Sequence, residues 1–150
     1  MPTPITYSFN EVKAAIVGPG GSFPIGAGAG AAEEGITVEA REDFDTLTIG
    51  ADGQAMHSLH MDRSGKLTIR LLKTSPVNAQ LDAMKNLQRS SGALHGVNTI
   101  TLRQVATNDV ITCVGVAFSK EPTLTYAKEA GINEWEFSAG QIFRILGSGT

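Results

Sequence analysis

Charged residues, cysteines and long apolar segments are all scarce in this sequence of 150 residues. Lysine, arginine, aspartate and glutamate together make up 18% of the chain, below the roughly 25% of an ordinary soluble domain. Because the composition is not that of a disordered chain, it indicates that part of the surface is buried against other subunits. The net charge of −3 and the lack of a basic run argue against tight nucleic-acid binding.

The scarcity of cysteine and of apolar runs excludes further classes of protein. Cys113 is the single cysteine, so no internal disulfide can form and the fold does not depend on oxidation. No apolar run approaches the roughly 18 residues of a membrane span, and no basic segment leads into an apolar one at the N-terminus. We therefore expect a soluble chain, made without an export signal, that forms one domain over residues 1–150 and has no membrane partner.

A glycine-rich stretch, residues 18–35, contains seven glycines. Within it, Gly26-Ala-Gly28-Ala-Gly30-Ala31 satisfies the dinucleotide-binding pattern G-x-G-x-x-G/A. That pattern needs a helix directly after the glycines, whereas this stretch leads into Ile36-Thr-Val-Glu-Ala-Arg41, which alternates like a strand. We interpret residues 18–21 as the turn of a hairpin and residues 26–35 as a connection of small residues that can pack against a neighbouring subunit.

The sequence contains no recognisable catalytic, metal or cofactor site. His57, His60 and Asp62 lie close together, but a zinc site needs further ligands, and His95 and Cys113 fall in unrelated segments. Cys113 lies inside an apolar run, where a thiol is not activated. No G-x-S-x-G elbow is present. We predict that the protein is not an enzyme and binds no cofactor.

Most of the chain alternates between apolar and polar residues, which is typical of strands with one buried face. Residues 110–118 are nearly all apolar and predict a strand that is buried on both faces. The other predicted strands cover residues 5–9, 12–17, 22–25, 36–41, 66–71, 100–103, 124–126, 135–137 and 141–146. Pro24 confines the return strand of the first hairpin to an edge or a bulge.

Residues 76–91 have the period of a helix instead. Ser75 suits the N-cap, Pro76 suits the first helical position, and Gly92 suits the position just past the end. The apolar stripe that must lie on a sheet consists of Val77, Leu81, Met84 and either Leu87 or Gln88. One helix among about eight strands predicts a mainly β fold of the α+β kind, a barrel or sandwich with the helix on its flank.

A long connection, residues 43–64, separates two of the predicted strands. Connections of this length in a compact domain are usually functional or disordered. This one carries the apolar residues Leu47, Ile49, Met56, Leu59 and Met61. It is too apolar to remain in water, so we expect it to meet a partner.

Together, these features resemble the tail tube family of contractile-tailed bacteriophages. The resemblance covers nearly the whole chain. The segments that carry it are residues 7–9, 18–21, 33–38, 48–53, 56–60, 70–78, 115–118, 125–128 and 133–137. It implies a virion protein, made in the host bacterial cytoplasm, that forms hexameric rings stacked into a hollow tube. The implied partners are other copies of the chain, the tail sheath protein, the baseplate or hub, the tail terminator, and, in the lumen, the tape measure protein and DNA.

The resemblance also suggests roles for particular residues. Ring stacking is expected to involve residues of the long connection, namely Leu47, Ile49, Asp52, Met56, His57, Leu59, His60 and Met61. Glu39, with Arg41 on the same strand face, is the candidate for the lumen, where an acidic wall would not grip DNA. Because the helix lies outside in such tubes, its polar residues Gln80, Lys85 and Arg89 are candidates for sheath contact.

Other readings remain open at this stage. The chain could belong to a different stacked-ring protein, such as the inner tube of a type VI secretion system, a tail terminator or a baseplate ring. A small-molecule-binding β-barrel is a rival from another class. Spontaneous tubes or hexamers would distinguish a ring protein from a monomeric barrel with a deep apolar pocket.

Overall fold

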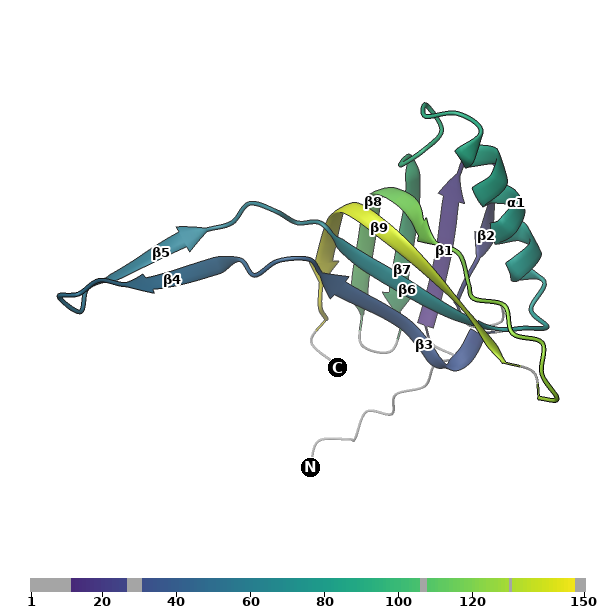
Figure 1. Ribbon diagram of the computed structural model, residues 1–150, viewed down its shortest axis with the longest axis horizontal. Helices are drawn as coiled ribbons and strands as arrows, with labels where there is room; N and C mark the ends of the chain where they lie inside the picture. Colours follow the sequence, from purple (N-terminus) through teal and green to yellow (C-terminus); the bar gives the residue numbers. More distant parts are fainter. Residues whose placement is uncertain (1–11, 27–30, 106–107, 130, 148–150) are drawn as a thin grey trace.

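The computed structural model describes residues 12–26, 31–105, 108–129 and 131–147. Within them the chain forms a sheet of seven antiparallel strands, one helix and a separate two-stranded hairpin (Figure 1). In chain order the elements are β1 (Val12–Gly18), β2 (Gly21–Pro24), β3 (Ala31–Ala40), β4 (Asp45–Ile49), β5 (Ala55–Leu59), β6 (Gly65–Leu72), α1 (Val77–Arg89), β7 (Asn98–Gln104), β8 (Asp109–Lys120) and β9 (Ile132–Ile145). The predicted fold class, mainly β with one helix, is confirmed.

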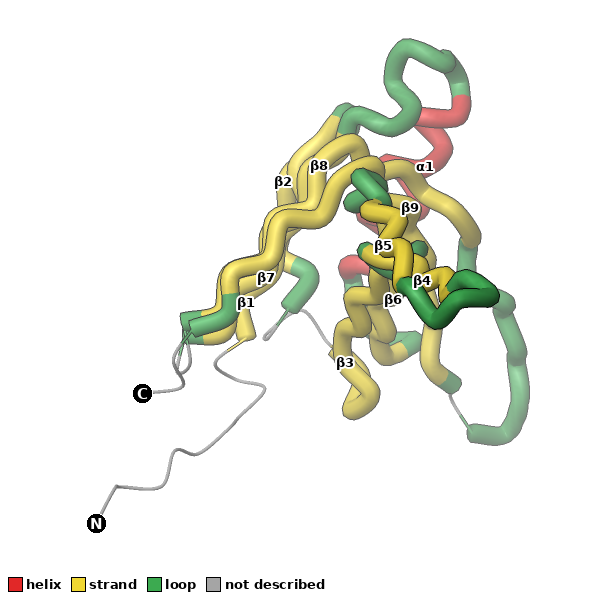
Figure 2. Tube along the Cα trace, turned by 90° about the vertical axis from the view of Figure 1, so that its left-hand side faces the viewer, coloured by secondary structure: helices red, strands yellow, loops and turns green. Residues whose placement is uncertain are grey.

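The seven-stranded sheet has the order β2-β1-β7-β8-β9-β6-β3 and is strongly curved (Figure 2). The sheet bends along its two long central strands, β8 and β9. Gly115 in β8 has a φ of 64° and lies against Gly140 of β9, and the pairing of β7 with β8 shifts register beside it. An irregularity of this kind bends a sheet. The two ends of the sheet therefore enclose one core, to which β1 contributes Ile16 and β6 contributes Leu67.

The alternating segments form strands largely as the sequence predicts, because one face of each is buried. Burial alternates residue by residue along β1 and along the first half of β9. β2 is an end strand of the sheet, as the position of Pro24 requires. Cys113 is buried in the core. The predicted strand at residues 5–9 lies outside the described residues.

Three strand predictions are wrong. Residues 110–118 do not form a strand buried on both faces, because alternate residues of β8 lie on the outer face of the sheet. Residues 124–126 are not in a strand, and Tyr126 is 82% exposed. The two strands expected near residues 135–137 and 141–146 are a single long strand, β9, since Gly140 lets the chain bend without leaving the sheet.

The predicted helix is present as α1, and its apolar stripe packs against the sheet. Val77, Leu81 and Met84 are buried, and the fourth position of the stripe is Gln88, because Leu87 is exposed. The Gln88 side chain exchanges two hydrogen bonds of 2.7 Å with Asn98 of β7. The buried amide pair thus satisfies its own polar atoms while it fixes the helix to the sheet.

The ends of the helix follow the expected chemistry with small shifts. Pro76 has helical backbone angles, and the Ser75 hydroxyl accepts a hydrogen bond of 3.3 Å from the backbone N–H of Val77. The helix ends at Arg89. Gly92 therefore lies in the following turn and not directly past the last helical residue.

Two connections are more regular than the sequence predicts. Residues 43–64 contain the paired strands β4 and β5, so this segment is a hairpin and not an irregular loop. β3 begins at Ala31, so the second half of the small-residue connection belongs to a strand, with a shift of register between Ala31 and Ile36. In both segments the backbone is paired as strands, although the composition of the sequence predicts irregular connections.

Candidate functional site

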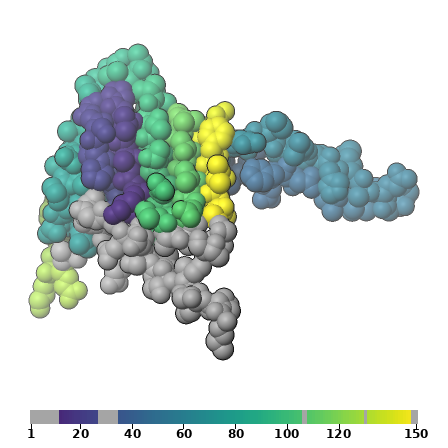
Figure 3. All heavy atoms as spheres, turned by 180° about the vertical axis from the view of Figure 1, so that it is seen from behind, coloured from purple at the N-terminus to yellow at the C-terminus, as the bar shows by residue number. Residues whose placement is uncertain are grey.

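The hairpin β4–β5 extends away from the body of the molecule (Figures 1 and 3). All five residues of β4 are exposed, as are four of the five in β5. Large apolar side chains in water are unusual in this number; Leu59 is 75% exposed and Met61, just beyond β5, is 79% exposed. Exposed apolar surface gathered on one element is typical of a protein–protein interface.

The pairing of the two strands gives the hairpin two different faces. Leu47 lies opposite His57, and Thr48 lies opposite Met56. Since side chains alternate along a strand, every second residue belongs to the same face. The face that we call the apolar face contains Asp45, Leu47, Ile49, Ala55, His57 and Leu59, and the one that we call the hydroxyl face contains Thr46, Thr48, Met56 and Ser58.

Each face of the hairpin has one polar side-chain contact that involves a histidine. On the apolar face, His57 Nδ1 lies 2.8 Å from a carboxylate oxygen of Asp45. On the hydroxyl face, Thr46 Oγ1 lies 2.6 Å from His60 Nε2. The two histidines thus contact opposite faces of the hairpin. Among the described residues, no three or more His, Cys, Asp or Glu side chains are arranged to hold a metal ion.

The turn at the tip of the hairpin is built by local hydrogen bonds. The backbone N–H of Gln54 donates to the Asp52 carboxylate at 3.1 Å, and the N–H of Gly50 donates to the carbonyl of Gln54 at 2.8 Å. Gly53 has a φ of 85°, which is costly for any residue with a Cβ. Asp52 therefore shapes the tip and also places a carboxylate there.

A groove of about 680 Å³ lies where the hairpin meets the sheet; we call it the root groove. Its lining includes the apolar residues Phe44, Met61 and Ile142 and the basic residues Arg63 and Arg144. Backbone hydrogen bonds fix this region, from Ile142 N–H to the carbonyl of Arg63 at 2.8 Å and from Arg41 N–H to that of Ser64 at 3.0 Å. Sequence patterns could not reveal this groove, because its residues come from three separate segments of the chain.

The candidate lumen residues lie at the end of β3 and just beyond it, next to the root groove. Glu39 and Arg41 are both exposed, and Glu39 pairs in register with Lys66 of β6. Lys66 forms an ion pair of 2.9 Å with Glu136, and the hydrogen bond from that pair raises the pKa of Lys66 above its ordinary value. Charges of both signs therefore alternate on this face, with Lys66 as the nearest cross-strand cation to Glu39.

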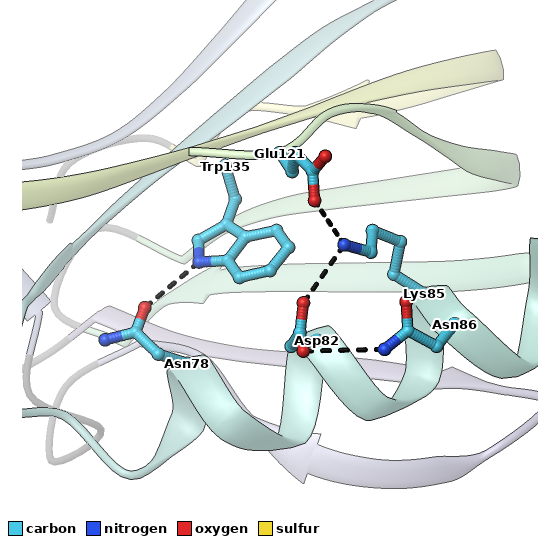
Figure 4. Close-up of polar contacts among 6 residues, drawn as sticks. All are labelled: Asn78, Asp82, Lys85, Asn86, Glu121 and Trp135. Carbon is cyan, nitrogen blue, oxygen red and sulfur yellow. Dashed lines mark hydrogen bonds and ion pairs between the residues drawn. The ribbon is translucent and has the colours of Figure 1, made fainter. Parts of the chain in front are cut away.

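The expected exposure of the helix residues is correct for two of the three. Gln80 and Arg89 are exposed, but Lys85 is buried, so its expected position on the outer face is wrong. Lys85 lies four residues after Leu81, at the border of the buried stripe. Figure 4 shows its ammonium group between the carboxylates of Asp82, at 3.0 Å, and Glu121. These contacts raise the pKa of Lys85, and the largest cause is the hydrogen bond that Lys85 donates to Glu121.

A second contact in the same region ties the helix to the sheet. The indole N–H of Trp135 donates a hydrogen bond of 3.0 Å to the side-chain oxygen of Asn78 in the first turn of α1 (Figure 4). Trp135 is itself packed edge-on against Phe118. The helix is thus held near both of its ends, by Asn78 and by Gln88.

Lys85 gives a prediction about stability. Replacing Lys85 by methionine is expected to change the free energy of unfolding by no more than about 1 kcal/mol, because Asp82 and Glu121 are half exposed and water screens them. Replacing it by glutamate should cost at least about 1–3 kcal/mol, since a buried carboxylate would face two others. Urea unfolding of both variants measures this, and equal stabilities would contradict the contact geometry.

Comparison with solved structures places the fold among the components of contractile injection systems. Similar chains occur in the baseplate of the anti-feeding prophage (TM-score 0.61, 14% identity, 97% of both chains covered). Others occur in the sheath-tube complex of the PVC extracellular contractile injection system in its extended state (0.58, 12%, 95% of this chain and 92% of that chain) and in its sheath/tube terminator (0.56, 9%, 97% of both). At these identities the likeness is one of fold.

The family follows from the sequence itself. A model of the family described as "Bacteriophage PhiTE tail tube protein" matches residues 5–147, so the chain belongs to this family of tail tube proteins. It is a structural protein of the phage tail tube, and the resemblance found in the sequence is confirmed. A search of curated proteins found no significant match. Among the described residues, no helix has the length and hydropathy needed to cross a membrane.

Proposed function

We propose that copies of this chain form hexameric rings that stack into the inner tube of a contractile tail, through which DNA leaves the virion. The observation that carries this proposal is the projecting hairpin, whose apolar face has no covering among the described residues. A single projecting arm cannot bury that face against its own body. In this proposal a second copy of the chain covers the apolar face, and the same contact is repeated for every subunit of the assembly.

The form of the contact favours an open, repeating assembly. An arm that binds a different surface on the next copy makes a heterologous contact, and such contacts generate rings or filaments. The sheet has two end strands, β2 and β3, each with one partner strand in the described sheet. Pairing of end strands between neighbours around a ring would remove edges that otherwise promote aggregation.

We infer that the wing carrying β3 and β6 faces the lumen, with Glu39 and Arg41 among the wall residues. The charges on this face alternate in sign, and the whole chain carries −3. Six copies would give a ring with a formal charge of −18. Such a wall presents no continuous basic track to DNA, so the phosphate backbone and the tape measure protein can pass without being held.

The helix side of the molecule is the proposed contact for the sheath. Gln80 and Arg89 are exposed there, while Lys85 is not available. The ends of the tube would meet the baseplate or hub and the terminator. In this proposal the protein is made in the cytoplasm of the host bacterium and functions in the virion.

Electron microscopy of the purified chain tests the proposal. Negatively stained samples at increasing concentration are expected to contain hollow tubes with six-fold symmetry in end view. Single rings that never stack would indicate a terminator or baseplate ring, and a dispersed monomer at every concentration would contradict the proposal. Analytical ultracentrifugation of the same samples separates these three outcomes by mass.

A further inference from the structure

We propose that assembly of the tube takes up protons through the pair formed by His57 and Asp45, so that a lower pH strengthens the assembly. This inference rests on the proposed function, because it concerns the apolar face of the hairpin, which the assembly covers, and it names a condition that regulates that step. The observation behind it is a titratable ring beside a carboxylate, on a face whose other residues are apolar.

The two side chains are diagonal neighbours across the paired strands. Asp45 lies opposite Leu59 and His57 lies opposite Leu47, so all four residues share the apolar face. The His57 Nδ1 atom is 2.8 Å from the Asp45 carboxylate oxygen. In the single subunit the pair is open to water, with 67% of the His57 side chain and 45% of the Asp45 side chain exposed. A partner that covers the two leucines therefore takes the pair out of water as well.

The charge of this pair is set by the histidine alone. Within the described part of the chain, Asp45 is the one charged residue in contact with His57, and β4 and β5 contain no other acid or base. His60 lies beyond β5 and contacts Thr46 on the hydroxyl face, while Asp52 belongs to the turn at the tip. The pair is therefore negative when the imidazole is neutral and uncharged overall when the imidazole is protonated.

Covering the apolar face changes which form of the pair is favoured. A carboxylate that leaves water loses hydration, and one hydrogen bond from a neutral imidazole replaces that hydration only in part. A protonated imidazole donates a charge-assisted hydrogen bond and also cancels the charge of the carboxylate. The covered state therefore favours the protonated ring more than the exposed state does, and each subunit gains up to one proton when it assembles.

The direction of the pH effect follows from this proton uptake. A falling pH favours the state that binds more protons, and here that state is the assembled one. Imidazoles titrate at about pH 6.5 and aspartates at about pH 3.9, so assembly should strengthen as the pH falls from about 8 to about 5.5, while the carboxylate stays charged. One proton per subunit limits the gain in association to about tenfold per pH unit.

Sedimentation of tubes across this pH range, at constant ionic strength, tests the inference. The threshold concentration for tubes of the wild-type chain is expected to fall as the pH falls. His57→Gln keeps an amide N–H for Asp45 but does not titrate, so its threshold should depend on pH at most about half as steeply. The matched control is His60→Gln, which removes a histidine that contacts the hydroxyl face and should keep the wild-type dependence.

A second variant, Asp45→Asn, is expected to reverse the sign of the pH effect. Without the carboxylate, a protonated His57 would be an unpaired cation on a covered face, and burial then favours the neutral ring. Tubes of this variant should form less readily as the pH falls, the opposite of the wild type. Neither residue belongs to the hydrophobic core of the described chain, so both variants should stay folded, with circular dichroism at each pH as the check.

The possible outcomes separate this inference from the proposed function. A weaker pH dependence in His57→Gln together with a reversed one in Asp45→Asn supports the proton linkage. Tubes whose threshold does not vary with pH, or varies equally in the wild type and in these two variants, would overturn the linkage and leave the tube intact. An equal loss in His60→Gln would assign the effect to the net charge of the hairpin and would also overturn it. A wild-type chain that stays monomeric at every pH would contradict the proposed function and the linkage together.

Discussion

Replacement of Leu47 and Ile49 by aspartate is expected to abolish tube formation while the chain stays folded. Both side chains lie on the apolar face of the hairpin and are more than half exposed, so the isolated subunit loses no core packing. In the assembly, two carboxylates would replace apolar contacts, and burying an unpaired charge costs several kcal/mol. Because each 1.4 kcal/mol is about a tenfold change in an equilibrium constant, the concentration needed for tubes should rise at least about a hundredfold.

The control for this experiment lies on the same strand. Thr46→Asp together with Thr48→Asp adds the same two charges to β4, on the hydroxyl face. Sedimentation of tubes at increasing concentration, with circular dichroism as the check on folding, compares the two double variants. Equal loss of tubes in both would mean that charge on the arm is enough to prevent assembly, and the distinction between the faces would be wrong.

Truncation of Leu81 to alanine should give the largest loss of stability of any single change in the helix. Leu81 is fully buried between α1 and the sheet. A leucine-to-alanine change at such a site removes apolar contact and leaves a cavity, which together cost about 2–5 kcal/mol. Urea unfolding, at a protein concentration below that at which tubes form, measures the free energy of the single subunit.

Leu87 provides the matched control in the same helix, because its side chain is 44% exposed. Leu87→Ala should cost less than about 1 kcal/mol. Similar losses at the two positions would contradict the packing of the helix. A Leu81→Ala subunit that still forms tubes would be consistent with the proposed function, since α1 then contributes to the fold and not to stacking.

The strands and the helix were largely predictable, because burial of one face imposes a period on the sequence. Ile16, Leu67 and Leu81 are each part of such a period, and each lies in the core. The alternation of apolar and polar residues is interrupted where one long strand bends and belongs to both halves of the curved sheet. β9 was divided in two in the sequence prediction because Gly140 interrupts the alternation, and only pairing with β8 shows that the strand continues.

The family could also be recognised from the sequence, from several short segments spread over the chain, and the match over residues 5–147 confirms it. That residues 43–64 meet a partner is likewise an expectation from the sequence, and it stays a prediction, although the structure shows that the apolar side chains of this segment are exposed. Apolar composition in a long connection is a local property, and a local property can be read without a structure. The roles proposed for its individual residues remain predictions.

What the sequence by itself determined is the set of elements with a strong period, the burial of Cys113 and the membership of a tail tube family. Only the tertiary structure decided that the long connection is a hairpin with one apolar face, that Lys85 is buried against Asp82 and Glu121, and that Phe44, Arg63 and Arg144 share a groove. The physical reason is that strand register, ion pairs and grooves join residues far apart in the chain. Such contacts leave no period in the sequence, and they become fixed only when the sheet curves and brings its segments together.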